Sequence, residues 1–501
     1  MVIRAHKTWW LTPAVLVGLG AVLLLWLPAA AGVKPVYLWT DRLVYLLVAM
    51  AVVLVGYIRH REHLSTPWRQ VFRRRIAMGA AVILGVYVIV GLLDSVHFRT
   101  PLPRQAESSE VHYSVRVTSV LDALAEPLRR RVEKTYSAPF ATHLYSKEAV
   151  DQADGSTIRV YPRLQYGGAH LEDPARDRGA DIAWHLVLAL VRGLGIWLLL
   201  VGMGAMATAY RTGLGFGPAA RRLLRGRTEL PWHVALYAAL AIIIFTMAVI
   251  QLGTKYHILG TDKVGQDVFY QAVKSIRTGL VIGTLATLVM LPFAIMLGIA
   301  AGYFKRWADD VIQYVYTTLN SIPGVLLIAA AILSIQIYIE NHPELFETGT
   351  DRADLQLLAL CIILGVTSWT GLCRLLRGET FKIAEMDYIE AATAFGVHHF
   401  KIIGRHILPN VMHIVLIIIV LDFSGLVLAE AVLSYIGVGV DPSTTSWGNM
   451  INSARLEMAR EPVVWWSLFA AFLFMFTLVL SANLFSDAVR DAFDPRLRAM
   501  T

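Results

Sequence analysis

Ten apolar runs, separated by polar linkers, constrain the fold of this chain more than any other feature of its sequence. Most are close to the roughly 20 residues that an α-helix needs to cross ~30 Å of hydrocarbon. Because 56% of the 501 residues are hydrophobic and only 16% are charged, the composition excludes an ordinary soluble protein. We expect an all-α polytopic membrane protein with spans near residues 10–31, 42–58, 76–97, 183–209, 232–252, 276–301, 316–339, 353–375, 411–437 and 464–486.

The first apolar run superficially resembles a secretory signal, because Arg4, His6 and Lys7 precede it. It is longer than the ~7 to 15 apolar residues of a signal sequence, and a second run follows almost at once. We therefore expect a retained first helix.

Basic residues in two short linkers predict the orientation of the spans. Arginines are concentrated in residues 59–75 and 211–227, and short basic loops remain on the cytoplasmic side. Counting spans from these loops places both termini in the cytoplasm and the segments near residues 260 and 447 outside. The formal net charge of +8 therefore reflects topology, and we expect no nucleic-acid partner.

A long polar segment, residues 98–182, separates the third and fourth spans and carries 12 basic and 12 acidic residues. Leucines at helical spacing predict a helix from 117 to 132 that Pro127 bends or divides, and Asp154-Gly155 predicts a β-hairpin. We expect a small α+β periplasmic insertion. The predicted domains are residues 1–97 with three spans, 98–182, 183–231 with a further span and a basic loop, and 232–501 with six spans.

A short helix signal lies in the polar gap after the eighth span, from Asp387 to Gly396. Asp387 is placed to cap the first turn, Glu390 to complete a capping box, and Gly396 to end the helix in a left-handed conformation. At helical spacing, one face carries the four residues Tyr388, Ala391, Ala392 and Phe395. A self-capped connector explains the pattern, and so does a surface for a soluble partner.

The Glu390-Ala391-Ala392 triplet, Gly396 and Leu408-Pro409 together resemble the EAA loop of ABC importer permeases. Further similarity lies in residues 259–269, 301–304, 446–450 and 487–495, which resemble the C-type permease subunit of dipeptide, oligopeptide and nickel importers. Two positions depart from the family pattern. His406 replaces the isoleucine of the family at large, and Gln266 replaces an arginine.

The resemblance implies a bacterial inner-membrane subunit that is not an enzyme and binds no cofactor of its own. It implies a second, similar permease, two ATPase subunits that use ATP and magnesium, and a periplasmic substrate-binding protein. The EAA loop then contacts the ATPase, through Asp387, Tyr388, Glu390, Ala391, Ala392, Phe395, Gly396, Leu408 and Pro409. The chain itself shows no phosphate-binding loop and no metal-ligand spacing, and Cys361 and Cys373 are too far apart on one predicted helix for a disulfide.

Two carboxylates lie within the ninth predicted span, where ionisable groups are costly and often functional. Asp422 and Glu430 share one half of the helix, so they either line a wetted translocation path or are satisfied by neighbouring helices. At the outer side, Thr261 or Asp262 is placed to cap a short helix. The resemblance implies that Thr261, Asp262, Gly265, Asp267 and Trp447 belong to a periplasmic collar facing the binding protein.

Two other classes of function are compatible with the pattern. An ATP-independent secondary transporter or channel would use Asp422 and Glu430 to bind protons or cations, although no inverted repeat is evident. A non-transporting protein would use residues 98–182 as a sensory or docking domain. The sequence leaves the substrate open among dipeptides, longer peptides, antibiotic peptides and metal chelates.

Overall fold

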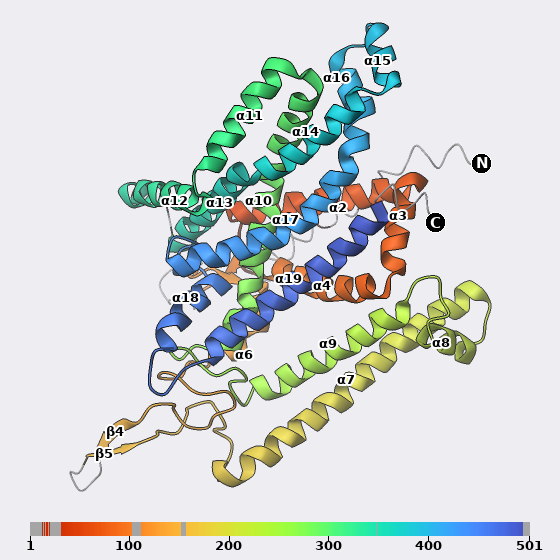
Figure 1. The fold of residues 1–501 in the computed structure, drawn as a ribbon. Coiled ribbons are helices and arrows are strands. Elements are labelled where there is room, and N and C mark those ends of the chain that lie inside the picture. Colours follow the sequence, from red (N-terminus) through yellow and green to blue (C-terminus); the bar gives the residue numbers. More distant parts are fainter. Residues whose placement is uncertain are drawn as a thin grey trace.

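The fold is an elongated helical bundle with a small strand-containing region at one end (Figure 1). The computed structural model describes residues 32–102, 112–151, 157–346 and 348–493, and positions 13, 15, 17, 18 and 20. The first predicted span, 10–31, lies largely outside the described residues. We refer to the end of the bundle that carries residues 98–182 as the insertion end and to the opposite end as the α15 end.

Nine described helical segments are long and apolar enough to cross a bilayer, so the predicted all-α polytopic fold is confirmed. Eight of the nine overlap the predicted spans closely, and six follow residue 231. They are α2 (Trp39–Arg59), α4 (Arg75–Asp94), α7 (Pro174–Thr212), α9 (Trp232–Gly253), α10 (Val268–Phe304), α12 (Gly324–Asn341), α13 with α14 (Gly349–Ser368 and Thr370–Ala384), α16 with α17 (His399–Ile402 and Leu408–Ile436), and α19 (Trp466–Phe493).

Shorter elements connect these segments. The helices are α3 (Glu62–Arg73), α5 (Val120–Leu124), α6 (Glu126–Arg129), α8 (Phe216–Leu224), α11 (Arg306–Ser321), η1 (Pro343–Leu345), α15 (Asp387–Ala394), the π-helical turn η2 (Ile403–Ile407) and α18 (Trp447–Glu457). Strands β1 (Lys34–Val36), β2 (His97–Arg99) and β3 (Thr118–Ser119) form one antiparallel sheet in that order, and β4 (Glu148–Asp151) pairs with β5 (Thr157–Val160).

The seventh predicted span was placed too early in the sequence. Residues 316–321 belong to α11, a separate amphipathic helix, and the membrane-crossing helix α12 begins at Gly324. Pro323 precedes α12 directly and has no N–H to continue α11 through the junction. Asp309, Asp310 and Gln313 also make α11 too polar for a span.

Helix α10 forms the centre of the bundle and contributes to three hydrophobic clusters. Its glycines allow neighbouring helices to approach closely, as their spacing predicts. A Cβ atom on Gly279 would lie 2.8 Å from the Trp447 ring, and one on Gly298 would lie 2.8 Å from the backbone oxygen of Cys373. Side chains at these positions would therefore separate α10 from α18 and α14.

The insertion has part of the predicted local structure, although residues 118–119 form a strand and the predicted turn at Asp154-Gly155 lies outside the described residues. Pro127 lies in α6, directly after the helix break at Ala125, so the expected helix is divided into α5 and α6. The two strands of the expected hairpin pair from Glu148 to Asp151. The insertion also packs on residues 254–267, the loop between α9 and α10, which fixes it to the helical bundle.

A buried histidine joins the insertion to that loop. His257 Nδ1 lies 2.8 Å from Asp267 Oδ2, and His257 Nε2 lies 3.5 Å from Glu133 Oε1. The Glu133 carboxylate also accepts backbone N–H hydrogen bonds from Gln165, Tyr166 and Gly167 of the insertion, at 2.9, 2.8 and 3.1 Å. This one carboxylate therefore connects two parts of the insertion to the core.

The ionisation of His257 predicts a pH dependence of the junction. Burial alone would lower the pKa of His257, but the carboxylates of Asp267 and Glu133 outweigh it and raise the pKa to about 9. Because the pKa of His257 is higher in the folded chain than its value of about 6.5 in the unfolded chain, protonated His257 stabilises the junction fully below pH 6.5. This stabilisation is lost as the pH rises through 9. We expect the junction to lose up to about 3 kcal/mol over this range.

Hydrogen–deuterium exchange of the Gln165–Gly167 amides, corrected for intrinsic rates, measures this loss in the full chain. Protection should fall between pH 7 and pH 9.5, and His257→Gln should remove the pH dependence. His143→Gln, in the same insertion but outside the junction, is the matched control and should keep it. Protection that is independent of pH in the unmodified chain would contradict the assignment.

Candidate functional site

Helix α15 lies at the extreme end of the bundle, beyond the ends of α14 and α17 (Figure 1). It contains the predicted Glu390-Ala391-Ala392 triplet, but its start differs from the expectation. The N-cap residue is Met386, without a side-chain hydrogen bond, and Asp387 is the first helical residue. The predicted Asp387 cap and Glu390 capping box are therefore wrong, which leaves the Glu390 side chain exposed and available.

The end of α15 is the predicted one. Gly396 has φ +73°, the left-handed conformation that favours glycine. Its N–H donates to the Thr393 carbonyl at 3.0 Å, and the Val397 N–H donates to the Ala392 carbonyl at 3.1 Å. These two bonds form a Schellman motif. The chain thus turns sharply after a helix of only two turns.

Two faces of α15 have different surroundings. Ile389 is 2% exposed, and Ala392 packs beside it against the interior, so Ala392 does not share the outer face as predicted. The outer face carries Tyr388 and Phe395, which are 44% and 87% exposed, and the exposed Ala391 between them. An aromatic side chain this exposed on a fixed helix is unusual for a surface that contacts only water.

The base of α15 is anchored in a hydrophobic cluster that unites the α15 end of the bundle. Ile389 packs there with residues of α10, α14, α16 and α17, among them Met290, Leu376, Ile383, Ile402 and Val411. Leu408 lies at the edge of this cluster, and Pro409 occupies the first turn of α17. Because several spanning helices share one cluster with Ile389, α15 is anchored to them and is not a free loop.

His406 lies beside α15 and contacts Tyr388. Its ring centroid lies 6.0 Å from that of Tyr388, and Asn410 Nδ2 donates to the Tyr388 hydroxyl at 3.4 Å. The π-helical turn from Ile403 to Ile407 carries His406 at this point. The histidine therefore supports one of the exposed aromatic residues of α15.

Glu430 is satisfied by its neighbours and does not face open space. It is 1% exposed, and its Oε1 accepts a hydrogen bond from the Ser434 hydroxyl at 2.7 Å. A Cβ atom on Gly448 of α18 would lie 2.9 Å from the same oxygen. Of the two explanations that the sequence left open, burial among helices is the one that this geometry supports for Glu430.

Asp422 differs from Glu430 in its surroundings. It lies halfway along α17 and is partly exposed. Within the described residues, no hydrogen bond or ion pair to its carboxylate is present. A carboxylate in the middle of a spanning helix is costly unless it meets water or a partner, so Asp422 remains the candidate for a passage.

At the insertion end, Asp267 takes the role expected of Thr261 or Asp262. The Asp267 carboxylate accepts from the Tyr270 N–H at 2.9 Å and caps α10. Thr261 is instead buried and donates to the Thr135 carbonyl, and Asp262 closes a loop by accepting from the Val264 N–H. The predicted cap at Thr261 or Asp262 is wrong because the helix begins five residues later.

Two further predicted collar residues are packing elements. Gly265 has φ +77° and lies against the Glu133 backbone, which leaves no room for a side chain. Trp447 is 1% exposed, and its Nε1 donates to the Ala272 carbonyl at 3.0 Å. The Trp447 ring is therefore buried and fixes α18 against α10.

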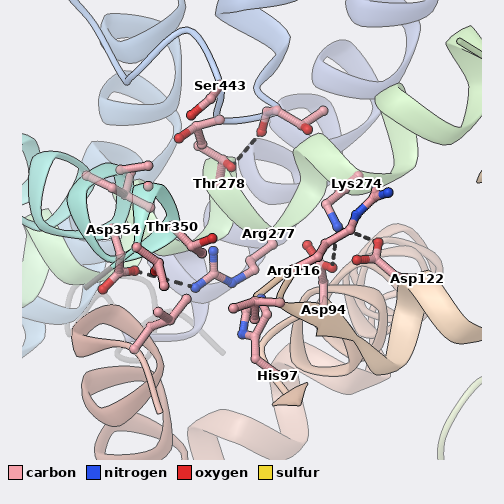
Figure 2. Close-up of a pocket in the computed structure, with 18 of the residues that line it drawn as sticks. Asp94, His97, Arg116, Asp122, Lys274, Arg277, Thr278, Thr350, Asp354 and Ser443 are labelled. Carbon is pink, nitrogen blue, oxygen red and sulfur yellow. Dashed lines mark hydrogen bonds and ion pairs between the residues drawn. The ribbon is translucent and has the colours of Figure 1, made fainter. Parts of the chain in front are cut away.

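A cavity of about 740 Å³ lies at the insertion end, between α10, α13 and residues from 94–97 and 115–122 (Figure 2). Its walls carry charged residues that the sequence interpretation did not single out. Figure 2 shows Arg277 beside Asp354, with Arg116 and Lys274 on the other side of the cavity. Lys274, Arg277 and Asp354 lie near the ends of apolar runs, whereas Arg116 lies within the polar segment 98–182 and has no such signal.

A buried ionic network forms one wall of this cavity and joins α2 to the core. Arg277 Nη2 donates to Asp41 Oδ1 at 2.7 Å and to the Thr40 hydroxyl at 2.8 Å, and it lies 3.8 Å from Asp354 Oδ1. His97 Nδ1 lies 2.7 Å from the other Asp41 oxygen. Helix α2 and strand β2 are thus fixed to α10 and α13 by charges that are largely buried.

Comparison with known proteins gives consistent matches to one family. A family model described as "Binding-protein-dependent transport system inner membrane component" matches residues 294–499, which include α15. The glutathione transport system permease protein GsiD of Pectobacterium atrosepticum is 32% identical over 243 residues, covering 48% of this chain and 74% of that protein.

Two further relatives extend the comparison. The oligopeptide transport system permease protein OppC of Mycobacterium tuberculosis is 31% identical over 248 residues, 50% of this chain and 78% of that protein. The dipeptide transport system permease protein DppC of Bacillus subtilis is 29% identical over 242 residues, 48% of this chain and 69% of that protein. Each similarity covers about half of this chain.

Proposed function

This chain belongs to the family of binding-protein-dependent transport system inner membrane components, and we propose that it is the permease subunit of an ATP-driven ABC importer. Relatives named for glutathione, oligopeptide and dipeptide transport support a peptide or peptide-like solute. Partner subunits hydrolyse ATP, and this chain provides part of the passage.

One observation carries the coupling role: α15 exposes two aromatic side chains while its base is fixed in the cluster shared by α10, α14, α16 and α17. A helix of this kind fits a groove of an ATPase subunit. The exposed Glu390 carboxylate is available to an arginine of that groove. Closure of the ATPases would then move several spanning helices together.

The passage forms between this chain and a second, similar permease. Asp422 is the residue of this chain that we assign to it, because its carboxylate is partly exposed in mid-helix. The proposed permease core is residues 232–501, preceded by an extension at residues 1–97, the insertion at 98–182, and a further helix with a basic loop at 183–231. The α15 end and both termini face the cytoplasm of a bacterial inner membrane, and the insertion end faces the periplasm and a substrate-binding protein.

Purification of the tagged full-length chain from its own membrane tests the assembly. The chain should be recovered with a second permease and ATPase subunits, and the complex in proteoliposomes should accumulate a tripeptide only when ATP is available. Accumulation by the purified chain alone, driven by a proton or cation gradient, would instead identify a secondary transporter, in which Asp422 would bind the coupling ion.

A further inference from the structure

The cavity at the insertion end is built jointly by the permease core and by residues that precede it. Lys274, Arg277 and Thr278 come from α10, and Thr350 and Asp354 come from α13. The opposite wall comes from Asp94, His97 and residues 115–117, outside the part that resembles other permeases. The volume of about 740 Å³ is within the roughly 300–1,000 Å³ of small-molecule sites.

The carboxylates in the walls of this cavity already have partners within the chain. Asp122 accepts from Lys274 and from the Tyr270 hydroxyl, and Asp94 accepts from the Ser119 hydroxyl at 2.6 Å and lies 3.5 Å from Lys274 Nζ. Asp354 accepts from the backbone N–H of Thr40 at 3.1 Å and lies near Arg277. The cavity therefore offers little to a cationic ligand.

Unlike the carboxylates, several hydrogen-bond donors in the cavity wall have no acceptor among the described residues. Arg116 is exposed at the cavity wall, and none of the described carboxylates lies within ion-pair distance of it. Arg277 Nε is buried, also without an acceptor among the described atoms. A buried donor without an acceptor is costly, because it has lost its hydrogen bond to water. Hydroxyl groups from Thr350, Thr444 and Thr445 add further donors along the wall.

We propose that this cavity is a binding site for the carboxylate group of a peptide-like solute, held by the exposed guanidinium of Arg116. The inference rests on the proposed function, because it takes the transported peptide as the source of the carboxylate. A guanidinium group presents two parallel N–H donors to a carboxylate and recognises it more specifically than a point charge does. The hydroxyl groups of Thr350, Thr444 and Thr445 in the cavity wall would donate hydrogen bonds to the carbonyl groups of the peptide backbone.

Calorimetric titration of the full complex in nanodiscs tests the site, with trialanine and trialanine amide as probes. The free acid should bind at least about tenfold more tightly than the amide, which is the effect of one charge-assisted hydrogen-bond pair. Arg116→Gln should remove this preference, and Arg116→Lys should retain part of it. The exposed Arg130, which pairs with Glu126 outside the cavity, provides the control Arg130→Gln, which should bind like the unmodified complex.

Three outcomes of the binding experiments would overturn the site. One is equal binding of acid and amide, and another is an unchanged preference in Arg116→Gln. The third is that Arg116→Gln weakens only the capture of the substrate-binding protein, which would make Arg116 a protein contact. Competition with acetate and phosphate identifies the ligand class, since binding of these ions at the same strength as trialanine would show a general anion site. Peptide uptake that is intact but indifferent to the C-terminal group would refute this site and leave the proposed function standing.

Discussion

Reversing the charge of Glu390 should abolish peptide uptake and detach the ATPase subunits while the chain still inserts into the membrane. Glu390→Arg places a cation where the proposed groove supplies one, and like charges at an interface cost several kcal/mol. Phe395→Asp should have the same effect, because it places a charge at the centre of an apolar contact. Uptake in either variant should fall at least about a hundredfold, to background.

Quantitative co-purification and uptake assays measure both effects. The matched control is Asp310→Arg on α11, the same charge reversal at an exposed position on the same end of the bundle. Asp310→Arg should retain most uptake and ATPase binding. If Glu390→Arg and Phe395→Asp both transport normally, α15 is only a connector between two spans.

The second large effect concerns the network that joins α2 to the core. Asp41→Ala should destabilise the chain by about 3–5 kcal/mol, because it leaves the buried Arg277 without its closest carboxylate. The Asp41 side chain is fully buried, so its removal leaves an unfilled space beside the Arg277 guanidinium. Arg277→Ala should be comparably damaging through the converse effect on Asp41 and His97.

The midpoints of thermal unfolding, monitored by tryptophan fluorescence with every purified variant in the same detergent, rank the stability of the variants. The double variant Asp41→Ala/Arg277→Ala should lose less stability than the two single variants lose together, because it leaves neither of these two charges without the other. Asp310→Ala, at an exposed acidic residue, is the control and should leave the midpoint unchanged. Additive losses, or an unchanged midpoint in Asp41→Ala, would show that the pair does not join α2 to the core.

The periodicity of apolar residues predicted most of the architecture. Eight described spans lie close to their predicted positions because length and composition alone determine whether a segment crosses hydrocarbon. The seventh span was misplaced because residues 316–322 carry no charged side chain and were joined to the apolar run that follows. Only the polar side chains earlier in α11, together with Pro323, show that the two helices are separate.

Of the predicted helix ends, the C-terminal end of α15 was correct and the N-terminal caps were wrong. The left-handed Gly396 was predicted correctly because glycine has a strong and local preference there. The cap at Asp387 failed because α15 begins one residue earlier, after Met386, which provides no side-chain cap. The cap at Thr261 failed because Asp267, another polar residue of the same loop, caps α10 instead. Asp267 caps α10 only because His257 and Thr261 hold the preceding loop in place.

The cavity at the insertion end could not be predicted from the sequence. Arg277 and Asp41 are 236 positions apart, and Lys274 and Asp122 are 152 apart. No periodicity brings such residues together. The same limit applies to Trp447 and Glu430, whose burial depends on how α17, α18 and α10 pack.

The central claim is that the outer face of α15 is covered by an ATPase subunit. Both described native cysteines, Cys361 and Cys373, are fully buried, so a single Phe395→Cys substitution provides a selective site for a water-soluble maleimide. Arg225→Cys, in the exposed loop after α8 at the same end of the bundle, serves as the control. The labelling rate at position 395 should be high in the isolated chain and at least tenfold lower in the assembled complex, while position 225 is labelled equally in both. Equal labelling of position 395 in the two states would contradict the account.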